Sequence, residues 1–304
     1  MPVRIGFVGA GEESRAMLET LQLVDEARVV AVCASDKTDI EYSLAETLAR
    51  RIKAKAFRDV KAMLRDESVD AVCCVASGRA RREAETLVLA AGCDLLLAPP
   101  LAPSVVKAQT LLQAATQSRS RLWISHHERF FASSEAARKI LAARHNTTIA
   151  CHGSWRSEKE SAKTVNFLAS STRLIGLLRF LCGDVKNVYA RSSASSLGLN
   201  IEFAGGALGA FVVGASCESR LRFVSQNQHL EWREQLTLLQ RGNETQHIEY
   251  SNNAQREELR LWVQSVQSGR RTLQKSSAQD SLQTLRVALA IQQSAKTNKP
   301  VRIN

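Results

Sequence analysis

The sequence is poor in aromatic residues and has no long apolar run. Phe, Trp and Tyr make up 5% of its 304 residues, which leaves little for a base-stacking nucleic-acid module. No stretch approaches the roughly 20 apolar residues of a membrane helix. The chain begins MPVRIGFVGAG and shows no signal-peptide pattern. We therefore expect a cytoplasmic protein with neither a nucleic-acid nor a membrane partner.

Cysteine pairs with metal-ligand spacing are also missing. The seven cysteines are odd in number, show no CxxC spacing and lie mostly inside apolar runs such as AVCCVAS. Such residues are typical of small buried side chains in a reducing compartment, rather than of disulfides or zinc ligands. We predict no metal site.

The chain carries an excess of positive charge. Lys and Arg number 41 against 30 Asp and Glu, a net charge of +11. The basic residues are spread along the chain, which favours a solvated surface. A small anionic ligand is compatible with the same composition.

Apolar strands and helices alternate over the first 118 residues, a pattern typical of a parallel sheet covered on both faces. The predicted strands are 3–8, 29–33, 54–57, 71–75 and 95–97, and the predicted helices are 13–23, 40–51, 60–65, 82–91 and 104–118.

From Leu122 the strands become longer and more polar. After LWISH they are predicted at 149–155, 185–191, 199–203 and 208–213, with a hairpin at 203–207 and two terminal helices, the second capped by Ser277. We therefore predict an α/β Rossmann domain at 1–120 and an α+β domain with a largely antiparallel, open-faced sheet at 121–304.

The turn after the first strand reads Gly9-Ala10-Gly11-Glu12-Glu13-Ser14. It is a GxGxxG pattern with Ser14 at the third position. Gly9 permits the tight turn, and Gly11 lets a diphosphate approach the helix N-terminus. The pattern predicts a dinucleotide-binding loop, although a structural turn that binds nothing gives the same letters.

The second strand ends in Ala34-Ser35-Asp36-Lys37. An acidic residue at this tip binds the ribose of NAD, whereas Ser35 and Lys37 suit the 2′-phosphate of NADP. We therefore expect an NAD(P) cofactor and favour NADP. We add Ser77 and Arg81, in the loop after the fourth strand, as cofactor contacts. An ordinary turn at 34–37 stays an alternative.

Several segments together resemble the Gfo/Idh/MocA oxidoreductase family over nearly the whole chain. They are DAVCCV at 70–75, AGCDLLL at 91–97, RF at 129–130, LLRFLCGD at 177–184, FAGGAL at 203–208 and the close ALAIQQSAKTNKPV at 288–301. The resemblance implies hydride transfer between a nicotinamide and a small, carbohydrate-like substrate. It also implies a homo-oligomer that covers the open sheet.

The family's acid/base residues are absent from this sequence. Where the family has Glu-Lys-Pro at the end of the fifth strand, this chain has Ala98-Pro99-Pro100, and proline supplies no amine. The family's aspartate and histidine correspond to Ala169 and Arg173. A further family histidine corresponds to Arg81.

Arg173 and His127 are our catalytic candidates, because an arginine binds an anion and a histidine exchanges protons near neutral pH. Two adjacent histidines on a strand point in opposite directions, so only one of His126 and His127 is expected to face a site. These residues leave two hypotheses open. One is an NAD(P)-dependent oxidoreductase with a non-standard site and a substrate that is anionic or otherwise unknown. The other is a non-catalytic homologue that binds a ligand or partner.

Overall fold

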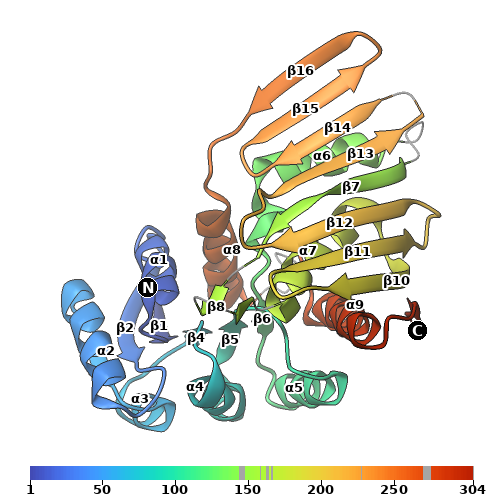
Figure 1. Ribbon diagram of the computed structural model, residues 1–304. Coiled ribbons are helices and arrows are strands. Elements are labelled where there is room, and N and C mark those ends of the chain that lie inside the picture. Colours follow the sequence, from blue (N-terminus) through green and yellow to red (C-terminus); the bar gives the residue numbers. More distant parts are fainter. Residues whose placement is uncertain are drawn as a thin grey trace. The chain divides into compact units, whose positions relative to one another are not determined.

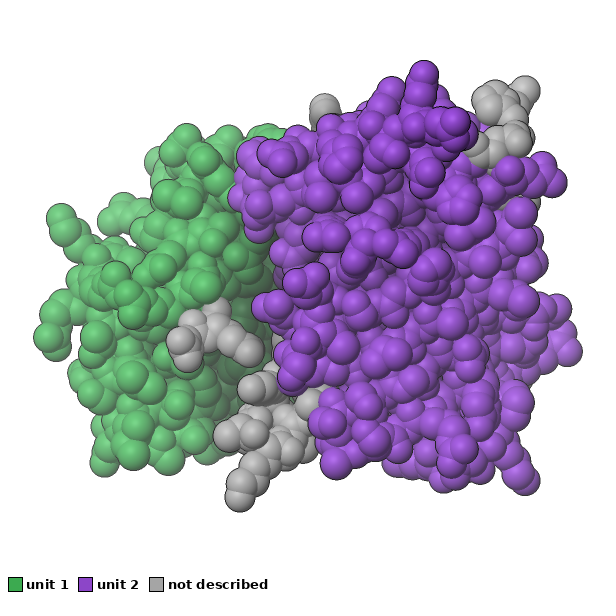
Figure 2. Space-filling model, turned by 45° about the horizontal axis from the view of Figure 1, so that its top comes forward, with its two compact units in different colours: residues 1–125, 255–280 green, residues 126–254, 281–304 purple. Residues whose placement is uncertain are grey.

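The computed structural model describes residues 1–143, 148–157, 159–161, 164–165, 167–226, 228–269 and 275–303. The described chain forms two compact units, coloured separately in Figure 2. The first comprises residues 1–125 and 255–280, and the second comprises residues 126–254 and 281–304.

The first unit is built on a six-stranded parallel sheet in the order β3-β2-β1-β4-β5-β6. Its strands are β1 (Val3–Val8), β2 (Ala27–Cys33), β3 (Lys55–Phe57), β4 (Ala71–Cys74), β5 (Asp94–Leu97) and β6 (Leu122–Ile124). Every residue of β4, β5 and β6 is buried. This burial on both faces explains their continuous apolar sequences and confirms the predicted α/β Rossmann fold.

Helices connect these strands as the sequence pattern indicates. They are α1 (Glu12–Leu21), α2 (Asp39–Ile52), α3 (Val60–Asp66), α4 (Gly78–Glu83), the π-helical turn η1 (Ala84–Val88) and α5 (Val105–Gln117). Side chains cap several of them: Thr38, Asp59 and Ser104 accept hydrogen bonds from the first turns of α2, α3 and α5. The helix predicted at 82–91 in fact begins at Gly78.

Helix α8 (Ala254–Ser268), although late in the chain, belongs to the first unit from Gln255 onward. Leu259, Trp262 and Val263 are almost fully buried. The Arg121 guanidinium pairs with Asp94 at the start of β5 and donates to the carbonyls of Ser265 and Val266, which attaches the end of α8 to the sheet. The first unit therefore also contains residues 255–280, which the predicted division at residue 120 places in the second domain.

The second unit is a nine-stranded mixed sheet in the order β16-β15-β14-β13-β7-β12-β11-β10-β17, in which only the β7–β12 pair is parallel. Its strands are β7 (Thr148–Arg156), β10 (Val185–Ser192), β11 (Ser196–Phe203), β12 (Leu208–Gly214), β13 (Arg220–Ser225), β14 (His229–Arg233), β15 (Leu236–Arg241), β16 (Glu244–Glu249) and β17 (Val301–Arg302). A separate small ladder joins β8 (Lys159–Ser161) and β9 (Thr164–Val165).

Helices lie along one face of this sheet (Figure 1). They are α6 (Ala132–Leu141), α7 (Phe167–Cys182) and α9 (Ala278–Thr297), and the 3₁₀ turn η2 (His127–Phe130) precedes α6. The Ser277 hydroxyl accepts a hydrogen bond from the Asp280 amide, as the predicted cap requires. The four strands β13–β16 and helix α6 were not among the predicted elements.

Strands such as β12 alternate buried and exposed residues, with Leu208 and Val212 on the uncovered face. The open-faced sheet domain expected from the sequence is thereby confirmed. No helix in the described ranges is long and apolar enough to cross a membrane.

Candidate active site

The β1–α1 loop has the geometry that its glycines predict. Gly9 adopts φ +131°, and a Cβ added there would lie 2.7 Å from the Ser14 hydroxyl oxygen and 2.9 Å from Val75 Cγ2. A Cβ added to Gly11 would meet nothing within 4 Å. Gly11 is the N-cap of α1, and no side chain caps the first amides of this helix. The open space beside a helix N-terminus fits the diphosphate of a dinucleotide.

The predicted cofactor residues Gly9, Gly11, Ser14, Ser35 and Ser77 all come from the carboxyl edge of neighbouring strands. The Ser35 hydroxyl accepts a hydrogen bond from the Ala10 amide at 3.2 Å, which ties the tip of β2 to the loop. Its own proton stays available for a ribose or a phosphate. Ser77 is exposed at the start of α4.

Asp36 and Lys37 already have partners within the first unit. Asp36 accepts hydrogen bonds from the Thr38 hydroxyl and amide, which hold the pKa of its carboxyl below the usual value. Lys37 lies 3.1 Å from Asp59 and is half-exposed. Because such exposed contacts contribute little free energy, both side chains can give them up to contact a ligand.

Arg81 has a structural role that the sequence did not indicate. Its guanidinium donates to the carbonyls of Ala98, Pro100 and Leu101, at 2.7, 2.6 and 3.2 Å, and pairs with the buried Glu85 at 2.9 Å. Arg81 thus holds the backbone of Ala98-Pro99-Pro100, the segment that stands where the family has Glu-Lys-Pro. A cofactor contact by Arg81 stays a prediction, and it would have to compete with these four partners.

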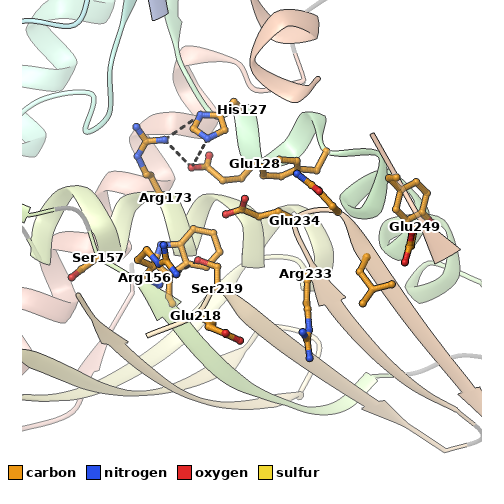
Figure 3. Close-up of a pocket in the computed structure, with 15 residues that line it drawn as sticks. His127, Glu128, Arg156, Ser157, Arg173, Glu218, Ser219, Arg233, Glu234 and Glu249 are labelled. Carbon is orange, nitrogen blue, oxygen red and sulfur yellow. Dashed lines mark hydrogen bonds and ion pairs between the residues drawn. The ribbon is translucent and has the colours of Figure 1, made fainter. Parts of the chain in front are cut away.

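A pocket of about 820 Å³ lies entirely within the second unit (Figure 3). Its polar lining is His127, Glu128, Arg156, Ser157, Arg173, Glu218, Ser219, Arg233, Glu234, Gln235, Glu249 and Tyr250, and Phe131, Trp155 and Leu236 supply apolar surface. Both predicted catalytic candidates, Arg173 on α7 and His127 on η2, therefore line one cavity.

The structure brings His127 and Arg173 into direct contact. Arg173 Nη1 lies 3.2 Å from His127 Nδ1 and donates to Glu128 Oε1 at 2.8 Å. His127 Nε2 lies 3.6 Å from the same Glu128 oxygen. His126 points away from this pocket: its ring is buried against Gly176 and lies near Ser281. Only His127 of the two adjacent histidines lines the pocket, although neither is in a strand, because β6 ends at Ile124 and η2 begins at His127.

Glu128 is the charged centre of this cluster. Its side chain is 5% exposed, and no described residue hydrogen-bonds its Oε2. Burial by itself raises the pKa of Glu128, but the charges of His127 and Arg173 and the Arg173 hydrogen bond outweigh burial and bring the pKa to about 2. Glu128 is therefore a carboxylate at neutral pH.

Glu128 and Glu234 line the pocket but were not among the predicted site residues. Glu128 was readable in His126-His127-Glu128, where an acid flanks the candidate histidine. Glu234 had no local signal, because it reaches the pocket from the turn between β14 and β15. In the described ranges no three potential ligands among His, Cys, Asp and Glu are grouped as a metal site requires.

The fold and these sites define a class of protein: two units, one with a glycine-rich loop on a Rossmann sheet and one with a polar pocket beside an open-faced sheet. Residues 3–126 match the model of a family described as an oxidoreductase family with an NAD-binding Rossmann fold, Gfo/Idh/MocA. This match confirms the resemblance to that family over the Rossmann domain.

One curated relative and two solved structures show the extent of the likeness. An inositol 2-dehydrogenase/D-chiro-inositol 3-dehydrogenase from Lacticaseibacillus casei is 28% identical over 134 residues, 43% of this chain and 37% of that protein. An Agrobacterium radiobacter oxidoreductase in complex with NAD⁺, L-tartaric acid and magnesium is 15% identical with a TM-score of 0.84, over 100% and 99% of the two chains. Myo-inositol 2-dehydrogenase from Lactobacillus plantarum is 18% identical with a TM-score of 0.84 over 100% of both chains. The chain thus matches little more than a third of the curated relative, and the solved structures share its fold.

Proposed function

We propose that the protein is an NAD(P)-dependent oxidoreductase that holds a small polar substrate in the pocket of its second unit. The observation that carries this proposal is the cluster of His127, Glu128 and Arg173 in one cavity. The cradle at Gly11 and the family of the Rossmann domain support the cofactor. When bound, the nicotinamide supplies hydride chemistry, and the protein residues bind, orient and neutralise charge.

Arg173 is the residue we assign to charge stabilisation. A carbonyl oxygen gains negative charge as hydride reaches its carbon, and a guanidinium fixed by Glu128 stabilises that charge without having to reorient. His127, in contact with the same guanidinium, hydrogen-bonds the substrate from the adjoining wall. These two residues take the place of the lysine and histidine that the family pattern leads one to expect.

The pocket favours a polyhydroxylated substrate. Its lining contains Arg156, Arg173 and Arg233 as donors, against Glu128, Glu218, Glu234 and Glu249 as acceptors, beside the Phe131 and Trp155 rings. Hydroxyl groups satisfy donors and acceptors together. A substrate that also bears a carboxylate is drawn by the net charge of the second unit, which has 19 Lys and Arg against 11 Asp and Glu. The inositol and tartaric acid in the names of similar proteins are of these two kinds.

Calorimetric titration with NADPH and then NADH tests the cofactor. We expect a dissociation constant in the micromolar range, about −8 kcal/mol, with NADPH binding more tightly because Lys37 and Ser35 lie at the tip of β2. Lys37→Gln is expected to weaken NADPH by about threefold, the size of one exposed charge interaction, and to leave NADH unchanged.

Failure of a folded protein to bind either nucleotide contradicts the proposal. It would favour the alternative, a non-catalytic homologue that binds a ligand or partner. Two observations favour this alternative. The segment Ala98-Pro99-Pro100 has no lysine, and Arg81 donates hydrogen bonds to its backbone. Equal loss of NADPH and NADH affinity in Lys37→Gln would contradict the preference for NADP.

We also propose a homo-oligomer formed through the uncovered face of the second unit's sheet. Leu208 and Val212 are 62% and 47% exposed there, beside an apolar-lined groove of about 470 Å³. Leu208→Lys places a charge in that face and is expected to shift the mass measured by light scattering at micromolar concentration from oligomer to monomer. A wild-type protein that is already monomeric contradicts the expectation.

We place the protein in the cytoplasm. All seven cysteines are free, and burial raises the pKa of Cys33 and Cys74 to about 12, which keeps both thiols protonated and unreactive. Unpaired buried thiols suit a reducing compartment.

A further inference from the structure

The pocket contains a second carboxyl group of a different kind, on Glu234. Arg233 and Leu236 are cross-strand partners, so Glu234 and Gln235 form the two-residue turn between β14 and β15. Figure 3 shows the carboxylates of Glu234 and Glu128 near one another, on the side of the pocket where Arg173 lies. Glu234 remains exposed at the pocket wall, where a substrate can reach it.

Two adjacent buried serines of α6 hold the backbones of both glutamates. Ser133 Oγ donates to the Glu234 carbonyl at 2.8 Å, and Ser134 Oγ donates to the Glu128 carbonyl at 2.6 Å. Ser134 also accepts the indole N–H of Trp232 at 3.0 Å. One helix therefore holds the backbone from which both carboxyl groups extend into the pocket.

The two titratable groups beside Arg173, Glu128 and His127, already have partners. Glu128 is held as a carboxylate by Arg173, so it has no proton to give. His127 has Arg173 at one ring nitrogen and Glu128 near the other. Glu128 therefore has no proton to exchange, and both ring nitrogens of His127 lie near partners within the cluster.

Glu234 lies in a different environment at the pocket wall. Partial desolvation at the pocket wall raises its pKa, the negative charge of Glu128 raises it further, and Arg156 opposes both effects. The charged and titratable groups that line the pocket with it are His127 and Glu128 from η2, Arg173 from α7, Arg156 from β7, Arg233 from β14, Glu249 from β16, Tyr250 directly after β16, and Glu218 from the β12–β13 connection. A carboxyl group that faces the cavity and whose pKa is raised can exchange a proton with a bound substrate.

We propose that Glu234 exchanges the proton with the reacting oxygen of the substrate, while Glu128 remains a fixed anion. This inference rests on the proposed function. In the oxidation direction the substrate C–H bond would break, and its hydride, with both electrons, would be accepted by the oxidised nicotinamide that the proposed function supplies. The O–H bond breaks at the same carbon, its proton forms a new O–H bond on the Glu234 carboxylate, and the C–O bond becomes a carbonyl. Reduction reverses each transfer.

Steady-state kinetics over pH 4–9 with NAD⁺ and either myo-inositol or L-tartrate test the assignment. Glu234→Gln is expected to lower kcat by about 100-fold or more, the typical contribution of a positioned acid or base, with KM nearly unchanged. It should also abolish the fall of kcat at low pH that protonation of Glu234 causes in the wild type. Glu244→Gln, an exposed glutamate of β16 outside the pocket, is the matched control and should retain both. A Glu234→Gln variant that keeps its kcat and its low-pH limb overturns the proposal, as does loss of that limb in His127→Asn.

A titration that needs no substrate separates this proposal from the proposed function. Carbon-13 spectra of glutamate carboxyls in the wild type and in Glu234→Gln identify the Glu234 signal. We expect it to titrate at higher pH than the Glu244 signal in the same protein. Titration at or below the pH of Glu244 overturns the assignment, even if both cofactors bind. Absence of turnover with normal cofactor binding contradicts the proposed function, and this titration then decides the role of Glu234.

Discussion

Replacing Arg173 by methionine is expected to lower the free energy of unfolding at pH 7 by about 3 kcal/mol, because it leaves the buried Glu128 carboxylate without its cation. Arg173 donates to Glu128 at 2.8 Å, and both side chains are largely buried. Methionine fills much of the volume of the arginine stem, so the loss reports charge rather than packing. Urea unfolding followed by circular dichroism measures it. Arg191→Met, at an exposed position on β10 of the same unit, is the matched control and should change stability by less than about 0.5 kcal/mol.

The stabilisation by the Arg173–Glu128 pair is also expected to depend on pH. The pKa of Glu128 is about 2 in the folded protein, below the value of about 4.3 in an unfolded chain. The group therefore stabilises the fold above about pH 4.3, and that contribution disappears as the pH falls toward 2. The stability difference between the wild type and Arg173→Met should shrink from pH 7 to pH 3. The double variant Arg173→Met/Glu128→Gln should recover much of the loss at pH 7. A difference that stays constant with pH would show that the arginine stabilises by packing alone.

The Rossmann unit could be predicted almost completely from sequence, for a physical reason. Strands buried on both faces must be continuously apolar, and β4 and β5 are. The meander β13–β16 escaped prediction because one face of it is open. Arg220, Arg222 and Arg233 surround Glu231 on that face, so the segment has the composition of a polar loop. The sequence signal for these strands was the alternation of apolar residues, and the structure buries Leu221, Phe223, Leu230 and Trp232.

The site divides in the same way. His127 and Arg173 could be proposed because their types suit the chemistry, and the structure places them in contact. Glu234 could not be proposed, since its approach depends on the register of β14 and β15 and on the Ser133 hydrogen bond, neither of which is local in sequence. The structural role of Arg81 was hidden for a related reason: its partners are backbone carbonyls, which carry no residue signature. Hydrogen bonds from a side chain to backbone carbonyls are therefore especially hard to predict from sequence.

Substitution of Gly9 by alanine is expected to destabilise the first unit by about 2–4 kcal/mol, from a strained backbone and an overpacked turn. Gly9 has φ +131°, where an L side chain is disfavoured, and the new Cβ would lie 2.7 Å from Ser14 Oγ and 3.2 Å from the Ala76 amide nitrogen. The Ala76 amide donates to the Val8 carbonyl, so it cannot move without loosening β1 from β4. Cofactor affinity should fall with the loop geometry.

Gly11→Ala, two residues along the same loop, separates stability from binding. Gly11 has φ −71°, and the added methyl meets nothing within 4 Å, so unfolding by urea should change by less than about 0.5 kcal/mol. The methyl nonetheless occupies the space that a diphosphate needs beside the α1 amides. Calorimetry should show NADH and NADPH affinity reduced by about tenfold or more, equivalent to about 1.4 kcal/mol. If Gly11→Ala binds both nucleotides like the wild type, the space beside Gly11 is not where the diphosphate lies. A loop that tolerates alanine at Gly9 as well would mean that the turn relaxes freely and that its shape is not built for a ligand.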